Sequence, residues 1–83
     1  MKIHHYTAVF QKEQEGGYTV IVPALSGCVT YGKTIEEATI AGREAIESYL
    51  GSLAKDGEKA PPDISFVSTI DISETTHPAA VYA

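Results

Sequence analysis

The side chains of this chain that could do chemistry are few and widely separated. Three histidines, His4, His5 and His77, are the residues that could bind a transition metal. His4 and His5 are adjacent, and adjacent side chains of a strand point to opposite faces, so the two cannot easily share one ion. We therefore interpret the histidines as ordinary surface or half-buried residues, and we expect neither a metal site nor a cofactor.

The single cysteine, Cys28, follows Ser26 by two residues and is the other candidate for chemistry. A nucleophilic cysteine needs a base or a cation beside its thiol, and the sequence shows no evident one. A lone cysteine is usually a small buried hydrophobe. Gly16 and Gly17 stand at a hairpin and not before a helix, so they do not form a phosphate-binding loop. We assign no catalytic residue and expect that the protein is not an enzyme.

A partner-binding surface is the remaining functional signal, and it lies on a predicted helix. Ile40 is placed about 140° around that helix from Ile35, away from the stripe expected to be buried. Glutamates surround Ile40 at helical neighbour spacings, an arrangement that would suit an apolar anchor within an acidic contact patch for a basic protein. The alternative is an acidic helix face in water with one exposed aliphatic residue. The candidate partner-binding residues are Glu36, Ile40, Glu44 and Glu47.

Three short strands are expected before this helix. Residues 3–10 predict a strand with apolar side chains on both faces, which is typical of the interior of a sheet. Residues 11–17 are polar and end in two glycines, so they predict the turn of a hairpin, and residues 18–22 predict the returning strand. Pro23 ends this pairing, ahead of a short third strand over residues 29–31.

The helix itself is predicted from about residue 35 to residue 55. Thr34 and Glu37 form a capping box at its start, and Gly57 is a natural stop at its end. Gly42 lies in the buried stripe, where we expect it to permit a close approach between helix and sheet. The stripe comprises Ile35, Ala38, Gly42, Ala45, Ile46, Tyr49 and Leu53.

A fourth strand is predicted over residues 64–72, where apolar residues alternate after the helix-breaking Pro61 and Pro62. The helix then acts as a right-handed crossover between parallel third and fourth strands. The sequence thus predicts an α+β single domain of β-β-β-α-β order over residues 1–73, with sheet order 3-2-1-4 and one helix packed on one face. Residues 74–83 form a tail, for which a fifth strand, a strand lent to a neighbour and a frayed end are the alternatives.

Size and charge limit the classes of partner. A chain of 83 residues with 43% hydrophobic content supports one small core, so we expect a homo-oligomer, a dimer or a tetramer, to add burial. The net charge of −5 argues against direct binding of nucleic acid or of an anionic membrane, and it suits a basic partner. The first residues lack a secretory signal and no apolar run could span a bilayer, so we expect a cytoplasmic protein.

Several of these segments together resemble the HicB antitoxin family over roughly residues 3–72, a pattern far more specific than one short motif. Ser26 stands where the family usually has proline. Many relatives append a DNA-binding domain, whereas only about ten residues follow the predicted fourth strand, so DNA binding is not carried over to this short form. The segments that carry the resemblance are 17–32, 34–38, 44–47, 49–50 and 56–58.

The resemblance implies a partly degraded ribonuclease H-like fold, and a small basic ribonuclease toxin of the HicA family whose RNA-cleaving site the antitoxin blocks. A ribonuclease H-type catalyst needs several carboxylates on two metal ions, one of them on the first strand. Residues 2–10 contain no acid, and Asp71 is the only acid in residues 64–72, which indicates that any such metal site is lost. A stand-alone oligomeric scaffold or small-ligand-binding module of the same fold, without a toxin, is the alternative function.

Overall fold

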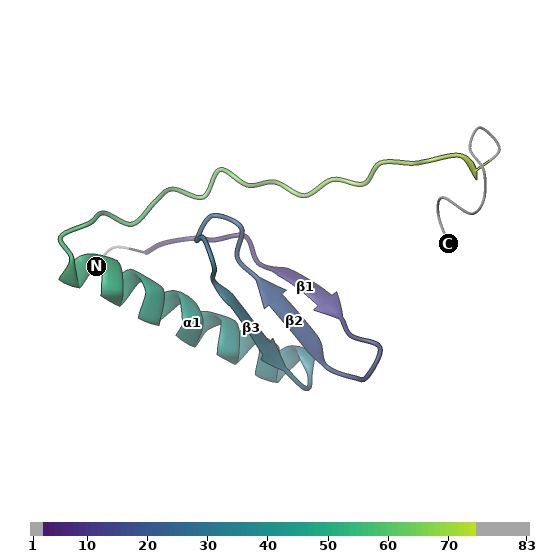
Figure 1. Ribbon diagram of the computed structural model, residues 1–83, viewed down its shortest axis with the longest axis horizontal. Coiled ribbons are helices and arrows are strands. Elements are labelled where there is room, and N and C mark those ends of the chain that lie inside the picture. The colour runs from purple at the N-terminus through teal and green to yellow at the C-terminus, as the bar shows by residue number, and fades with distance from the viewer. Residues whose placement is uncertain (1–2, 75–83) are drawn as a thin grey trace.

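A three-stranded antiparallel sheet covered on one face by one helix forms the body of the protein (Figure 1). The computed structural model describes residues 3–74. The sheet order is β1-β2-β3. This arrangement confirms the α+β class and the β-β-β-α order. The elements are β1 (Val9–Lys12), β2 (Tyr18–Ile21), β3 (Val29–Gly32) and α1 (Ile35–Lys55).

The β1–β2 hairpin turns at the two glycines, as predicted, but Gln11 and Lys12, which were predicted to lie in the turn, belong to β1. Gly16 and Gly17 have φ angles of 103° and 82°, a region that residues with a side chain rarely adopt. The amide of Glu13 donates to the carbonyl oxygen of Gly17 at 3.0 Å and closes the turn. Tyr31 of β3 donates from its hydroxyl to the carbonyl oxygen of Gly16 at 3.0 Å, which ties the turn to the far edge of the sheet.

Helix α1 begins and ends where the sequence predicts. At its start, the amide of Glu37 donates to Oγ1 of Thr34 at 3.1 Å, and the Glu37 carboxylate accepts from the amide of Lys33. At its end, Gly57 has a φ of 72° and donates to the carbonyl oxygen of Ala54, while the amide of Glu58 donates to that of Leu53. This is a Schellman motif, which satisfies the last carbonyl groups of the helix.

The core lies between α1 and the loop that joins β2 to β3. Val22, Leu25 and Cys28 are buried there, and the amide of Cys28 donates to the carbonyl oxygen of Leu25 at 2.9 Å. Half-buried side chains from the N-terminal segment and from α1 surround this cluster. They are Tyr6, Ala8, Ala45, Ile46, Tyr49 and Leu50.

Two glycines mark the close approach of α1 to the sheet. A methyl group on Gly42 would lie 3.4 Å from Cγ1 of Val20, which confirms the expected proximity. A methyl group on Gly32 would overlap the backbone of Ala38 in α1. Ile35, predicted to be buried, is instead 52% exposed, because the closest approach comes one turn later at Ala38.

The prediction that residues 3–10 form an interior strand was wrong in two respects. β1 begins at Val9 and forms an edge of the sheet. The register pairs Val9 with Ile21, so Thr7 would face Pro23, which has no N–H to donate. The amide of Val22 is bonded to Cys28 on the β3 side. Pairing with β2 therefore stops at Val9.

The predicted fourth strand was also wrong: among residues 3–74 the sheet holds three strands, so the order 3-2-1-4 is not formed. After α1 the chain runs extended past the start of β1 and away from the body (Figure 1). The element order observed among the described residues is thus β-β-β-α. Most of the predicted tail, residues 75–83, lies outside the described residues, as does His77.

Candidate partner-binding surfaces

Residues 61–74, here called the extended arm, are attached to the body at one point beside β1. The hydroxyl of Tyr6 donates to the carbonyl oxygen of Pro61 at 2.6 Å. Oδ2 of Asp63 accepts two hydrogen bonds from Thr7, from the amide at 2.8 Å and from Oγ1 at 2.7 Å. These bonds from Thr7 favour the ionised form and hold the pKa of the Asp63 carboxyl below its usual value. Side-chain bonds thus take the place of a β-ladder here.

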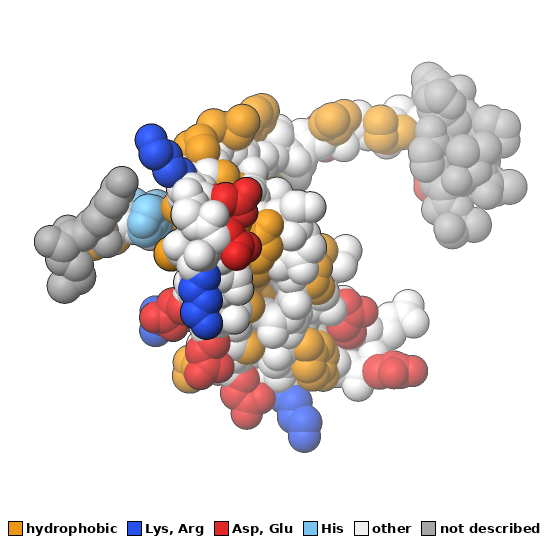
Figure 2. Space-filling model, turned by 60° about the vertical axis from the view of Figure 1, so that its left-hand side comes forward, with side chains coloured by type: hydrophobic (Ala, Val, Ile, Leu, Met, Phe, Trp, Pro, Cys, Tyr) orange, Lys and Arg blue, Asp and Glu red, His pale blue; other side chains and the backbone are white. Residues whose placement is uncertain are grey.

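The structure brings the four predicted contact residues together on the outer side of α1. Glu36, Ile40, Glu44 and Glu47 are all exposed and span about 80° of the helix circumference. Ile40 is 55% exposed and lies opposite the buried Ala38 and Gly42. Figure 2 shows acidic side chains along the lower side of the molecule, where α1 lies. The geometry supplies one apolar side chain among carboxylates, and its role in binding stays a prediction.

A second exposed surface, on the sheet face opposite α1, was missed by the sequence analysis. The strand register places Val9, Ile21 and Val29 in one row across β1, β2 and β3. The next row contains Val20, which is buried against α1, so the first row points away from the helix. Val29 is exposed and so is Tyr31 on the same face. The sequence feature that could have revealed this surface is the presence of apolar residues on both faces of residues 3–10. We interpreted that feature as evidence for an interior strand.

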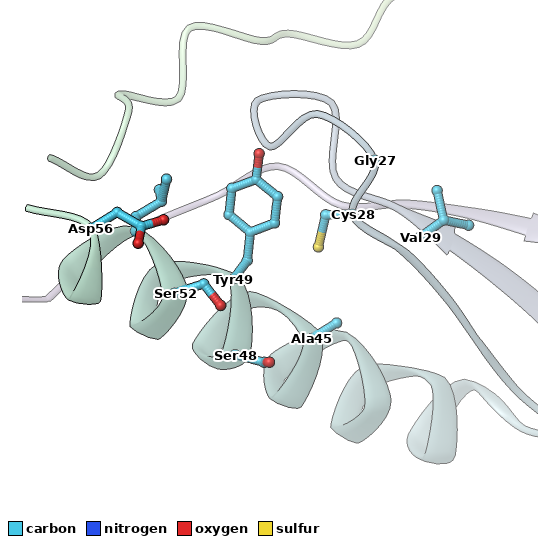
Figure 3. A pocket seen from close by; sticks show the side chains of 9 residues that line it. Gly27, Cys28, Val29, Ala45, Ser48, Tyr49, Ser52 and Asp56 are labelled. Atoms are coloured by element: carbon cyan, nitrogen blue, oxygen red, sulfur yellow. The ribbon is translucent and has the colours of Figure 1, made fainter. Parts of the chain in front are cut away.

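A groove of about 490 Å³ lies between the second half of α1 and the start of β3 (Figure 3). The Cys28 side chain points towards α1 in this view, and burial raises the pKa of its thiol. A thiol that stays protonated is a poor nucleophile. This confirms the interpretation of Cys28 as a buried hydrophobic residue. The groove is lined by Gly27, Cys28, Val29, Ala45, Ser48, Tyr49, Ser52, Leu53 and Asp56.

Metal ligands do not converge in the part of the chain that the structure describes: no three His, Cys, Asp or Glu residues there are grouped to hold an ion. His4 and His5 are exposed, and the His4 ring stacks on Tyr6 with 6.3 Å between ring centroids. None of the helices within residues 3–74 has the length and apolar character needed to cross a membrane.

A comparison with known protein families identifies the family to which this chain belongs. Residues 6–80 match the family described as the HicB-like antitoxin of bacterial toxin–antitoxin systems. The chain belongs to the HicB-like antitoxin family. The match extends through both the β-β-β-α body and the extended arm, and it confirms the resemblance found in the sequence. HicB-like antitoxins are typically non-enzymatic.

Individual relatives of this HicB-like chain carry the family name UPF0150. A UPF0150 protein of Thermoplasma acidophilum is 52% identical over 58 residues, which cover 70% of this chain and 84% of the relative. One of Synechocystis is 38% identical over 71 residues, covering 86% and 90% of the two chains. One of Helicobacter pylori is 53% identical over 49 residues, covering 59% and 67%.

Proposed function

We propose that this protein is an antitoxin that binds a small basic ribonuclease toxin of the HicA type and neutralises it by occluding its RNA-cleaving site. The family match over residues 6–80 is the observation that carries this proposal, because the family is one of antitoxins in toxin–antitoxin pairs. The proposed place of action is the cytoplasm, where a ribonuclease meets its RNA.

The outer side of α1 is the surface we assign to the toxin. Ile40 would enter an apolar depression on the partner, and Glu36, Glu44 and Glu47 would face its basic side chains. These glutamates are exposed, so their main contribution is a faster association that weakens as salt is added. The net charge of −5 acts in the same direction over a longer range.

The proposed inhibition is steric and uses no chemistry of this chain. β1 carries no acid. Asp63, at the start of the arm, is bonded to Thr7, and it belongs to no group of three His, Cys, Asp or Glu side chains within residues 3–74. Such a chain neutralises a ribonuclease by covering the groups that the RNA must reach. Loss of inhibition should therefore follow loss of binding in every variant.

Co-expression tests this function. The reading frame that neighbours the gene for this chain is expressed alone and together with it, and growth, RNA cleavage and co-purification are measured. We expect the neighbour to stop growth alone and to be rescued by this chain. A neighbour that is harmless, or whose toxicity this chain does not change, overturns the proposal and favours the stand-alone scaffold or ligand-binding alternative.

A matched pair of variants tests the surface. Ile40→Glu and Ile35→Glu introduce the same charge on the same helix at side chains that are 55% and 52% exposed. The two positions are about 140° apart around the helix. We expect Ile40→Glu to weaken toxin binding at least tenfold and Ile35→Glu to leave it within twofold. Equal affinity for both variants would remove α1 from the toxin contact and leave the antitoxin function to another surface.

A further inference from the structure

The extended arm carries apolar side chains that the rest of the described chain does not cover. Ile64, Phe66 and Ile70 are 85%, 88% and 84% exposed. Figure 2 shows hydrophobic side chains along the arm at the top of the molecule. Residues 64–72 make no backbone–backbone hydrogen bond to any other described residue. An extended, apolar and unpaired backbone is a template for strand pairing.

The order of residues in the arm is self-complementary. In an extended chain, positions 64, 66, 68, 70 and 72 share one face. Antiparallel pairing of two arms centred on Ser68 would place Ile64 opposite Ile72 of a second copy and Phe66 opposite Ile70. On the other face, Val67 would lie opposite Thr69 of the second copy, so each contact occurs twice, as a two-fold axis requires.

Charge favours the same register. Asp71 is the only charged residue among residues 64–72. In this register it lies opposite Ser65 of the second copy, and the two Asp71 side chains are about 20 Å apart, at opposite ends of the ribbon. No like charges oppose each other, in agreement with the pairing rules for antiparallel strands.

The free edges of the sheet are poorer partners for the arm. β1 has four residues and ends in Gln11 and Lys12, and β3 likewise has four residues. Short edges, and edges that carry lysine, resist pairing. Asp63 holds the start of the arm beside Thr7, yet the arm departs from β1 without forming a ladder. A second arm, which is longer and matches residue for residue, is the better partner.

We propose that residues 64–72 pair with the same residues of a second copy of this chain, as an antiparallel two-stranded ribbon with its two-fold axis at Ser68. The ribbon joins two β-β-β-α bodies, satisfies the backbone of both arms and brings their apolar side chains into cross-strand contact. This proposal does not depend on the proposed antitoxin function. A ribbon of this size is a small interface, so the expected dissociation constant is on the order of micromolar.

The first test is the mass of the full-length chain in solution, measured by sedimentation equilibrium from about 1 µM to about 500 µM, a range that brackets the expected affinity. We expect a dimer that dissociates on dilution. Phe66→Asp should weaken the dimer at least tenfold, and Ile40→Asp, on the outer side of α1, should not. Circular dichroism should show the same helix content for all three proteins. A monomer at every concentration, or equal effects of the two variants, overturns the proposal.

The second test fixes the register by disulfide trapping. Ser68→Cys should cross-link with itself on mild oxidation, because the two positions face each other across the axis. Ser65→Cys is the matched control and should not, because its two copies would lie about 20 Å apart. A mixture of Ser65→Cys with Asp71→Cys should cross-link between chains. Cys28 is buried and should not take part.

Other occupants of the arm give distinct results. If the arm pairs with the β1 edge of either copy, Ser68→Cys does not cross-link with itself and instead cross-links with a cysteine introduced in β1. Equal cross-linking of Ser68→Cys and Ser65→Cys indicates contact without register. Both results overturn the ribbon. Failure of toxin binding would leave the solution mass and the cross-links unchanged, so the two proposals fail separately.

Discussion

The body and the extended arm contain the same kinds of apolar residue in opposite environments. Leu25 and Val20 are 1% exposed, enclosed by α1 and the sheet. Phe66 in the arm is almost fully exposed. The sequence predicts a strand both for residues 18–22, which include Val20, and for residues 64–72 of the arm. The difference shows that alternation identifies a segment able to form a strand but does not identify the chain that supplies its partner.

The way in which each region is held also differs. The body is closed by backbone hydrogen bonds between strands, by the turns around Leu25 and by both ends of α1. The arm is held by side-chain bonds from Tyr6 and Thr7 at its first residues. Substitutions in the body should therefore change folding. Substitutions in the arm should change association and leave the body folded.

The largest contrast should come from truncating one apolar side chain in each region. Leu25→Ala removes a fully enclosed side chain and should lower the free energy of unfolding by about 3 kcal/mol. Phe66→Ala should lower it by less than about 0.5 kcal/mol in dilute protein, because surface changes have little effect on folding. Urea unfolding at low concentration, where the arm is unpaired, measures both. Similar losses from the two variants would place Phe66 inside the cooperative unit of the body.

A smaller effect should distinguish two glycines of the body. Gly32→Ala pushes a methyl group into the backbone of Ala38, which cannot move without displacing the start of α1. We expect a loss of about 2 kcal/mol, as for other overpacked sites. Gly51→Ala is the control, since a methyl group there meets nothing within 4 Å, and it should add up to about 1 kcal/mol through helix propensity. A stabilised Gly32→Ala protein would show that α1 is not tightly docked on β3.

The Thr34 cap of α1 should contribute still less to the free energy of unfolding. Thr34→Ala removes the acceptor for the Glu37 amide and should lower stability by about 1 kcal/mol. Thr39→Ala on the same helix is the control. Its hydroxyl only donates to the carbonyl oxygen of Ile35 within the helix, so its loss should be neutral or slightly favourable. Thermal unfolding of both variants checks this difference, which equal midpoints would contradict.

Local signals in the sequence predicted most of the body. The glycines at residues 16 and 17, the Thr34 cap and Gly57 each act within a few residues, and the hairpin turn at the glycines and both ends of the helix are confirmed. The grouping of Glu36, Ile40, Glu44 and Glu47 also follows from helical spacing alone. These features need no knowledge of which distant segment packs against which.

Long-range pairing could not be predicted in the same way. The pattern of residues 64–72 is equally compatible with a strand beside β1 and with one paired to another chain, because alternation shows which side chains share a face but not which strand lies beside them. Apolar side chains on both faces of residues 3–10 predicted a strand in the interior of the sheet. They could not show whether that strand has a neighbour on each side or lies at an edge with one face of the sheet open. β1 begins at Val9 because the next pairing position on β2 would place Thr7 opposite Pro23. This register is known only once the β1–β2 hairpin is built.

The smallest expected effect lies at Asp63, where the two regions meet. Its pKa is lowered in the folded chain by Thr7, so the anchor is fully present above the ordinary aspartate pKa of about 3.9 and is lost as pH falls below it. The Thr7 amide resonance should therefore shift as the pH falls below about 3.9, because the Asp63 carboxylate of the folded chain takes up its proton below the ordinary aspartate pKa. Asp63→Asn should abolish this titration, whereas Asp71→Asn, farther along the arm, should leave it unchanged. If the Thr7 amide titrates alike in all three proteins, Asp63 does not anchor the arm, and the boundary between the two regions lies closer to the end of α1.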